Sequence, residues 1–215
     1  MLSIVQSPDP LLNTVCEPCD FNDKSLKRLA KQMAHVMYKN AGCGLAAPQV
    51  GILRRAVLVV NDQEEMLELI NPEIIASEGE EDGLEGCLSV PGYWGYVKRP
   101  AWVKVRAHDR NGNEFETEGT GMTARCFCHE LAHLDGQLYT DLADRIYTTE
   151  ELDACWRSRG NDDSLYGHPG FRCPVPRGAD CRRTHHLRRI HPAGPAEKQG
   201  NEAPGTTCKA DSPCT

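Results

Sequence analysis

The run His129-Glu130-Leu131-Ala132-His133 constrains the fold of this chain more than any other feature. Residues four apart lie on one face of an α-helix, so two helical histidines at this spacing can reach a single metal ion. Glu130 then projects to the open side of that ion, where a carboxylate can take a proton from bound water. The run therefore predicts an internal helix that carries a metal site, and a pair of unrelated histidines on a helix surface is the alternative.

Residues of types that favour the two ends of a helix flank this run. Thr123 is of a type favoured as an N-cap, and Gly136 is of the type that commonly follows the last helical residue. We therefore expect the helix to begin at Thr123 and to end before Gly136.

A second helix is predicted near the start of the chain. Apolar residues recur at intervals of three and four over Lys24–Lys39, which is the spacing of an amphipathic helix. Glycine and small residues then dominate Gly42–Gly51. This composition predicts a loop whose backbone can approach another group closely, because few side chains stand in the way.

Several segments have the patterns of strands. Ala56–Asn61 is typical of a buried strand, and Leu67–Ser77 of another that is interrupted by Pro72. Trp102–His108 alternates apolar and polar residues, and a turn joins it to Glu114–Glu118, which predicts a hairpin. Because strands and helices do not alternate as βαβ units, we expect an α+β fold with mostly antiparallel β-sheets around the internal helix.

The composition changes after Trp156. Residues 157–215 are rich in Pro, Gly, Arg, His and Cys and have almost no apolar periodicity, so we expect disorder there. A chain of 215 residues with this division predicts one folded domain over residues 1–156 and a tail without a fold of its own over residues 157–215.

Charge and hydropathy exclude several kinds of protein. The formal net charge of -7 disfavours nucleic acid as the main ligand. Acidic residues concentrate between Glu64 and Glu85, which is typical of a solvated surface without a function of its own. The first residues lack the pattern of a signal peptide, and no apolar run approaches the ~20 residues that cross a bilayer. We therefore expect a cytoplasmic protein that does not enter membranes.

The 11 cysteines have irregular spacings, and without a sign of secretion we expect most of them to be reduced thiols. Cys16 and Cys19 form a CxxC pair, but no second pair exists to complete a zinc site, so this signal is weak. Together with Cys43, they are interpreted as small buried or incidental residues rather than as ligands.

Two further motifs accompany the histidine run. Gly42-Cys43-Gly44-Leu45-Ala46-Ala47-Pro48-Gln49-Val50-Gly51 precedes it, and so does Glu85-Gly86-Cys87-Leu88-Ser89-Val90-Pro91-Gly92. In this order and at this approximate spacing, the three motifs resemble those of the peptide deformylase family. The resemblance covers about Ile4 to Ile146.

The resemblance implies a metal-dependent hydrolase that removes the formyl group from the N-terminal N-formylmethionine of newly synthesised proteins and releases formate. It implies that Cys87, His129 and His133 hold one divalent metal ion, with one position left for water. In the family this ion is usually Fe²⁺, and Zn²⁺ or other divalent ions can replace it. The ligand set alone does not choose between them.

The resemblance also implies roles for the surrounding residues. The metal-bound water attacks the formyl carbon with Glu130 as general base, while the Gln49 amide and the Leu88 N–H donate to the oxyanion. Nascent formylated peptides are the expected partners, and the ribosome is another. The residues expected to bind the substrate are Gly44, Met122, Arg125 and Cys126.

Two positions depart from the family pattern. Members usually have Gln before the first histidine and Asp before the second, whereas this chain has Cys128 and Ala132. The missing Asp is expected to weaken the support around the ligands, and Cys128 adds a nearby thiol that can oxidise or bind another metal, but neither change removes a ligand. These departures and the unusual tail make a catalytically weakened metal-binding descendant one alternative interpretation. The HExxH run by itself makes a metallopeptidase another.

A reading-frame shift or gene overlap is a second interpretation of the tail. Tyr166–Pro174 and Arg189–Pro195 can be encoded by codons that, read one base later, give strings resembling the start of methionyl-tRNA formyltransferase. The nucleotide sequence decides this point. A Cys/His metal tract is a third interpretation, although its residues lack recognised ligand spacing.

Overall fold

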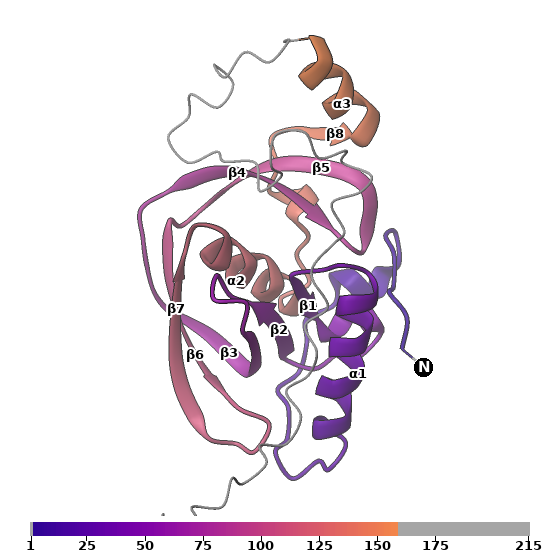
Figure 1. The fold of residues 1–215 in the computed structure, drawn as a ribbon. Helices are drawn as coiled ribbons and strands as arrows, with labels where there is room; N and C mark the ends of the chain where they lie inside the picture. The colour runs from indigo at the N-terminus through magenta and orange to yellow at the C-terminus, as the bar shows by residue number, and fades with distance from the viewer. Residues whose placement is uncertain (1, 159–215) are drawn as a thin grey trace, which may run out of the picture. The chain divides into compact units, whose positions relative to one another are not determined.

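Residues 2–158 of the chain are described by the structure, a computed structural model (Figure 1). The predicted tail therefore lies outside the described residues, apart from two positions at the end of the last helix. That helix is α3, Thr149–Ser158. The division into a catalytic domain and a tail stays a prediction.

Eight strands form two antiparallel sheets within residues 2–158. The larger sheet has the order β1-β2-β3-β6-β7, and the smaller has the order β4-β5-β8. The strands of the larger sheet are β1 (Gly44–Ala46), β2 (Ala56–Val60), β3 (Met66–Glu78), β6 (Trp102–His108) and β7 (Glu114–Thr120). Those of the smaller sheet are β4 (Glu81–Cys87), β5 (Val90–Arg99) and β8 (Ile146–Thr148).

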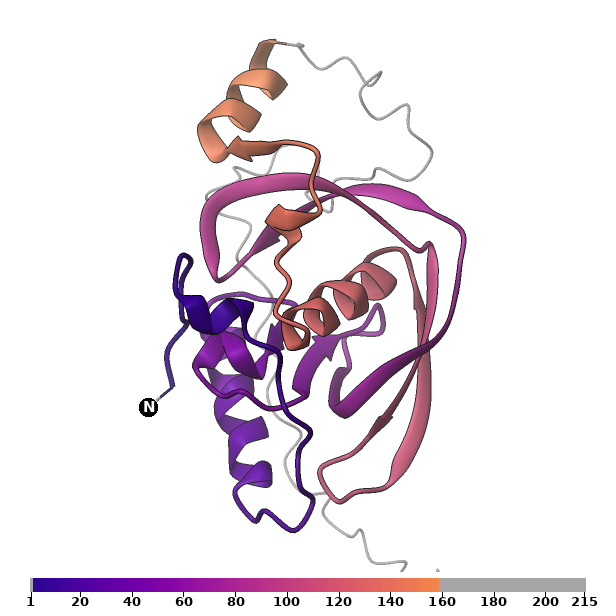
Figure 2. The same ribbon diagram turned by 180° about the vertical axis from the view of Figure 1, so that it is seen from behind.

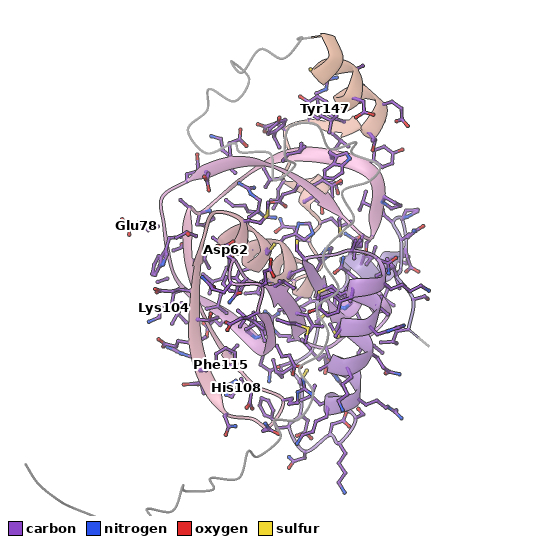
Figure 3. All side chains as sticks on the ribbon, viewed as in Figure 1. Asp62, Glu78, Lys104, His108, Phe115 and Tyr147 are labelled. Atoms are coloured by element: carbon purple, nitrogen blue, oxygen red, sulfur yellow. The ribbon has the colours of Figure 1, made fainter. Side chains whose placement is uncertain are left out.

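The expected α+β fold with antiparallel sheets is confirmed, as are the predicted strands. The β3 strand changes register against β6 between Ile70 and Glu73, where Pro72 cannot donate to the ladder. The hairpin is β6 and β7, in which buried Val103 and Val105 alternate with residues such as Lys104, labelled in Figure 3. Strands β4, β5 and β8 were not predicted, and acidic residues obscure the pattern of β4. The expectation of a loop over Gly42–Gly51 was wrong in part, because β1 and a 3₁₀ helix lie within it.

Helix α1 (Leu26–Lys39) confirms the predicted amphipathic helix. Its buried side chains include Met33 and Met37, and they pack with Leu45 and Leu58 of the larger sheet. The apolar face thus fixes the helix beside β1 and β2.

Helix α2 (Gly121–Leu134) carries the histidine run and contacts strands of both sheets (Figures 1 and 2). Phe127 and Leu131 pack into a cluster with Val57 and Val105. Most residues of the helix are buried, as expected of an internal helix.

The predicted start of α2 was wrong. The N-cap is Thr120, and Thr123 lies inside the helix, where its hydroxyl accepts a hydrogen bond from the backbone of Asp62, labelled in Figure 3. The predicted end is confirmed: Gly136 has a φ of 72°, a conformation that glycine adopts at little cost.

Three 3₁₀ helices complete the elements: η1 (Pro10–Asn13), η2 (Ala47–Val50) and η3 (Tyr139–Asp141). Among residues 2–158, no helix is long and apolar enough to cross a membrane. The cytoplasmic location stays a prediction.

Candidate metal centre

One thiol and two imidazoles meet where strand β4 ends beside helix α2. The ligand atoms of Cys87, His129 and His133 all lie within 4.8 Å of one another. The Cys87 Sγ is 3.3 Å from His133 Nε2. The structure thus brings the three expected ligands together, because the helical turn aligns both histidines and the last residue of β4 adds the thiol.

The chemistry of these donors fits a divalent transition metal. Burial raises the pKa of the Cys87 thiol to about 12, so this thiol ionises only when a cation takes the place of its proton. Burial also lowers the pKa of His133 to about 3, which keeps the imidazole in the neutral form that binds metals. Thiolate sulfur and imidazole nitrogen are both ligands of divalent transition metals such as zinc, and three protein ligands are the number that catalytic zinc sites use.

Glu85 supports His129 from behind. Its Oε2 lies 2.9 Å from His129 Nδ1, and because an ionised carboxylate only accepts, Nδ1 is the donor. This bond leaves the Nε2 lone pair of His129 free to bind a metal. Arg99 donates to the same carboxylate through Nε at 2.9 Å and Nη2 at 3.1 Å. Although burial opposes ionisation, the bonds from His129 and Arg99 lower the pKa of Glu85 to about 2.

The expectation that the acidic run is a solvated surface was wrong for Glu85, whose exposed fraction is 4%. A signal was present in the sequence. Glu85 precedes Cys87 by two residues, a spacing that places both side chains on one face of a strand.

Arg125 departs from its expected place in a substrate pocket. Its Nη1 donates to Glu85 Oε1 at 3.0 Å and to the carbonyl of Val97 at 2.7 Å, and its Nη2 donates to the carbonyl of Glu81 at 2.8 Å. The guanidinium is buried in these contacts. It therefore joins helix α2 to strands β4 and β5.

Glu130 is buried beside the ligands. Its Oε2 has no hydrogen-bond partner among the described residues, and burial raises the pKa of this carboxyl well above its usual value. A Cβ on Gly44 would lie 2.3 Å from Glu130 Oε1. Strand β1 therefore approaches the glutamate so closely that only glycine fits.

Gln49 is held in one orientation. Its Oε1 accepts from the Ala46 backbone at 2.8 Å, and its Nε2 donates to Cys87 Sγ at 3.3 Å. Leu88 follows Cys87 directly, in the turn between β4 and β5. Both expected oxyanion donors thus lie next to the thiol.

The remaining positions of interest lie on α2. Met122 is 50% exposed, whereas Cys126 and Cys128 are buried. The Nδ1 of His133 has no hydrogen-bond partner among residues 2–158, so the two histidines differ in their support.

A Cys/His/His cluster with a buried glutamate beside it, formed by the inner helix and the end of a strand in an α+β fold, is an arrangement of metal-dependent hydrolases. A sequence model described as polypeptide deformylase matches residues 1–148. The peptide deformylase of Caldanaerobacter subterraneus subsp. tengcongensis is 50% identical over 145 residues, 67% of this chain and 91% of that protein. Peptide deformylase 1 of Bacillus subtilis is 45% identical over 150 residues, 69% of this chain and 94% of that protein.

Solved structures agree. A peptide deformylase from Legionella pneumophila matches with a TM-score of 0.62 and 37% identity, over 74% of this chain and 97% of that one. One from Thermotoga maritima matches with a TM-score of 0.63 and 36% identity, over 67% of this chain and 99% of that one. The chain belongs to the peptide deformylase family.

Proposed function

We propose that the chain removes the formyl group from the N-terminal N-formylmethionine of nascent peptides, releasing formate and a free amine. The observation that carries the proposal is the cluster of Cys87, His129 and His133 with Glu130 buried beside it. Membership of the peptide deformylase family supports the same reaction.

Cys87, His129 and His133 would hold one divalent ion, and we propose Fe²⁺ as the native metal. When bound, such an ion supplies Lewis acidity to the reacting carbonyl and water. Glu85 orients His129 for this role. Metal analysis of protein purified without oxygen tests the choice of iron, and zinc as the dominant metal would contradict it.

Glu130 is proposed to move the proton. Its Oε2 is unpartnered among residues 2–158, so this oxygen is available to take a proton from the attacking water and to pass it to the departing amine. The close approach of Gly44 keeps the carboxylate in place.

Gln49 Nε2 and the Leu88 N–H are proposed to donate to the oxyanion that forms on the formyl oxygen. The Ala46 backbone holds the Gln49 amide so that its NH₂ faces Cys87. Donors fixed before the reaction stabilise the developing charge without reorganisation, and each is typically worth about 3 kcal/mol.

The peptide is proposed to lie along β1. This strand is the last in its sheet, so its outer edge suits the addition of an extended peptide at Gly44. Met122 and Cys126 on α2 are proposed to contact the methionine side chain, and the contacts of Arg125 give no support for a similar role. Binding to the ribosome stays a prediction.

The test is formate release from a formyl-Met-Ala peptide by iron-loaded protein under anaerobic conditions. Glu130→Gln keeps the size of the side chain and removes its capacity to accept a proton, so release should fall by about 10²–10⁴-fold with unchanged metal content. No release by the fully loaded natural chain would contradict the proposal and favour a weakened metal-binding descendant. Cleavage inside unformylated peptides would favour a metallopeptidase.

A further inference from the structure

Two thiols outside the ligand set face each other between strand β1 and helix α2. The Sγ atoms of Cys43 and Cys126 are 3.4 Å apart. Cys43 directly precedes Gly44 at the start of β1, and Cys126 lies one helical turn before Glu130. The pair therefore spans the two elements between which the peptide is proposed to bind.

The geometry needs little change to form a bond. A disulfide has an S–S length of about 2.05 Å, so the two sulfurs would have to approach by about 1.4 Å. Cys43 is an exposed residue, whereas Cys126 is buried, so a soluble oxidant meets Cys43 before Cys126. One thiol can thus react first and the other resolve the product.

We propose that Cys43 and Cys126 are a redox modification site, at which a reversible disulfide ties β1 to α2 and blocks peptide binding. The effect on peptide binding rests on the proposed function, whereas formation of the bond does not.

The oxidant is a small-molecule disulfide such as oxidised glutathione. The Cys43 thiolate attacks one sulfur of the reagent, forms a mixed disulfide and releases one thiol. The Cys126 thiolate then attacks the Cys43 sulfur and releases the second thiol. The two cysteines lose two electrons and two protons, and the reagent gains them. A hydrogen bond from Cys126 lowers the pKa of Cys43 to about 7, which favours the first attack.

The effect on the site follows from the lack of space around Gly44. Its Cα is already so close to Glu130 that an added Cβ would lie 2.3 Å from Oε1. Drawing Cys43 toward α2 moves Gly44 against Glu130 and displaces the edge of β1. Cys87 lies on β4, and His129 and His133 lie on α2, a buried helix that contacts strands of both sheets. Because the movement falls on the short edge strand β1 rather than on this helix, the metal should stay bound while peptide binding is lost.

The experiment treats the metal-loaded full chain with oxidised glutathione in the absence of oxygen. Digestion without reductant, followed by mass spectrometry, should find a peptide in which Cys43 is linked to Cys126. The affinity for the product peptide Met-Ala, measured by calorimetry, and the rate of formate release should both fall and recover with dithiothreitol. Metal content should not change.

Two serine variants complete the test, each compared with its own untreated state. Cys43→Ser should form no linked peptide and keep its starting affinity and rate. Cys19→Ser is the matched control, because Cys19 is a buried thiol 3.6 Å from the Arg55 carbonyl, an acceptor that a serine hydroxyl can also use. It should behave as the natural chain does.

Absence of the linked peptide would overturn the proposal, as would a linked chain that binds Met-Ala normally, or an equal loss in Cys43→Ser. Failure of the untreated chain to release formate would instead contradict the proposed function. Mass spectrometry and calorimetry would still decide the fate of the thiol pair.

Discussion

Glu85→Gln removes one negative charge from beneath the candidate metal centre and keeps the shape of the side chain. The natural carboxylate accepts from Arg99, Arg125 and His129, with donor–acceptor distances between 2.9 and 3.1 Å. The substitution leaves two buried guanidinium groups without a counter-charge. Breaking a buried pair from one side costs about 3–5 kcal/mol, so the free energy of unfolding should fall by this amount.

Urea unfolding of the metal-free protein, followed by circular dichroism, measures this change without a contribution from metal binding. Because Glu85 also orients His129, metal affinity should fall by about 10–100-fold in a competition titration with a chelator. Glu80→Gln is the matched control, since Glu80 pairs with Lys98 in solvent and its loss should leave both quantities unchanged. If the two variants are equally stable and bind metal equally well, the reasoning about Glu85 is refuted.

Two further variants test the proposed substrate side of the site. Gln49→Ala removes the amide 3.3 Å from Cys87 Sγ and should lower kcat by about 10²–10³-fold, and a change confined to KM would speak against an oxyanion role. Gly44→Ala places a Cβ 2.3 Å from Glu130 Oε1 and should lower formate release with unchanged metal content, whereas a fully active variant would show that the glutamate position is not critical.

Local periodicity was enough to predict much of the fold. Helix α1, strand β2 and the β6–β7 hairpin follow from spacings of three and four or of two residues, which neighbouring positions in the sequence display directly. The start of α2 was placed too late, because Thr123 uses its hydroxyl for the Asp62 backbone and the cap falls at Thr120. A contact with a loop that is distant in the sequence cannot be recognised from the residue pattern of the helix.

The site was less predictable from pattern alone. The spacing of His129 and His133 predicts a metal site, but Cys87 lies on another element and was assigned through the family resemblance. Glu85 looked like one more surface charge, because its partners Arg99 and Arg125 are 14 and 40 residues away in the sequence. Only tertiary structure brings those charges together.

The two outer strands of the larger sheet differ in how they limit self-association. β1 is 3 residues long, so its free edge can hold a short peptide but offers little template for another copy of the chain. β7 is 7 residues long and places Glu114, Glu116 and Glu118 at alternate, exposed positions. Charged side chains on an edge strand discourage edge-to-edge aggregation. The short length of β1 and the charges on β7 thus both limit self-association of the sheet, while the edge of β1 stays open to a peptide.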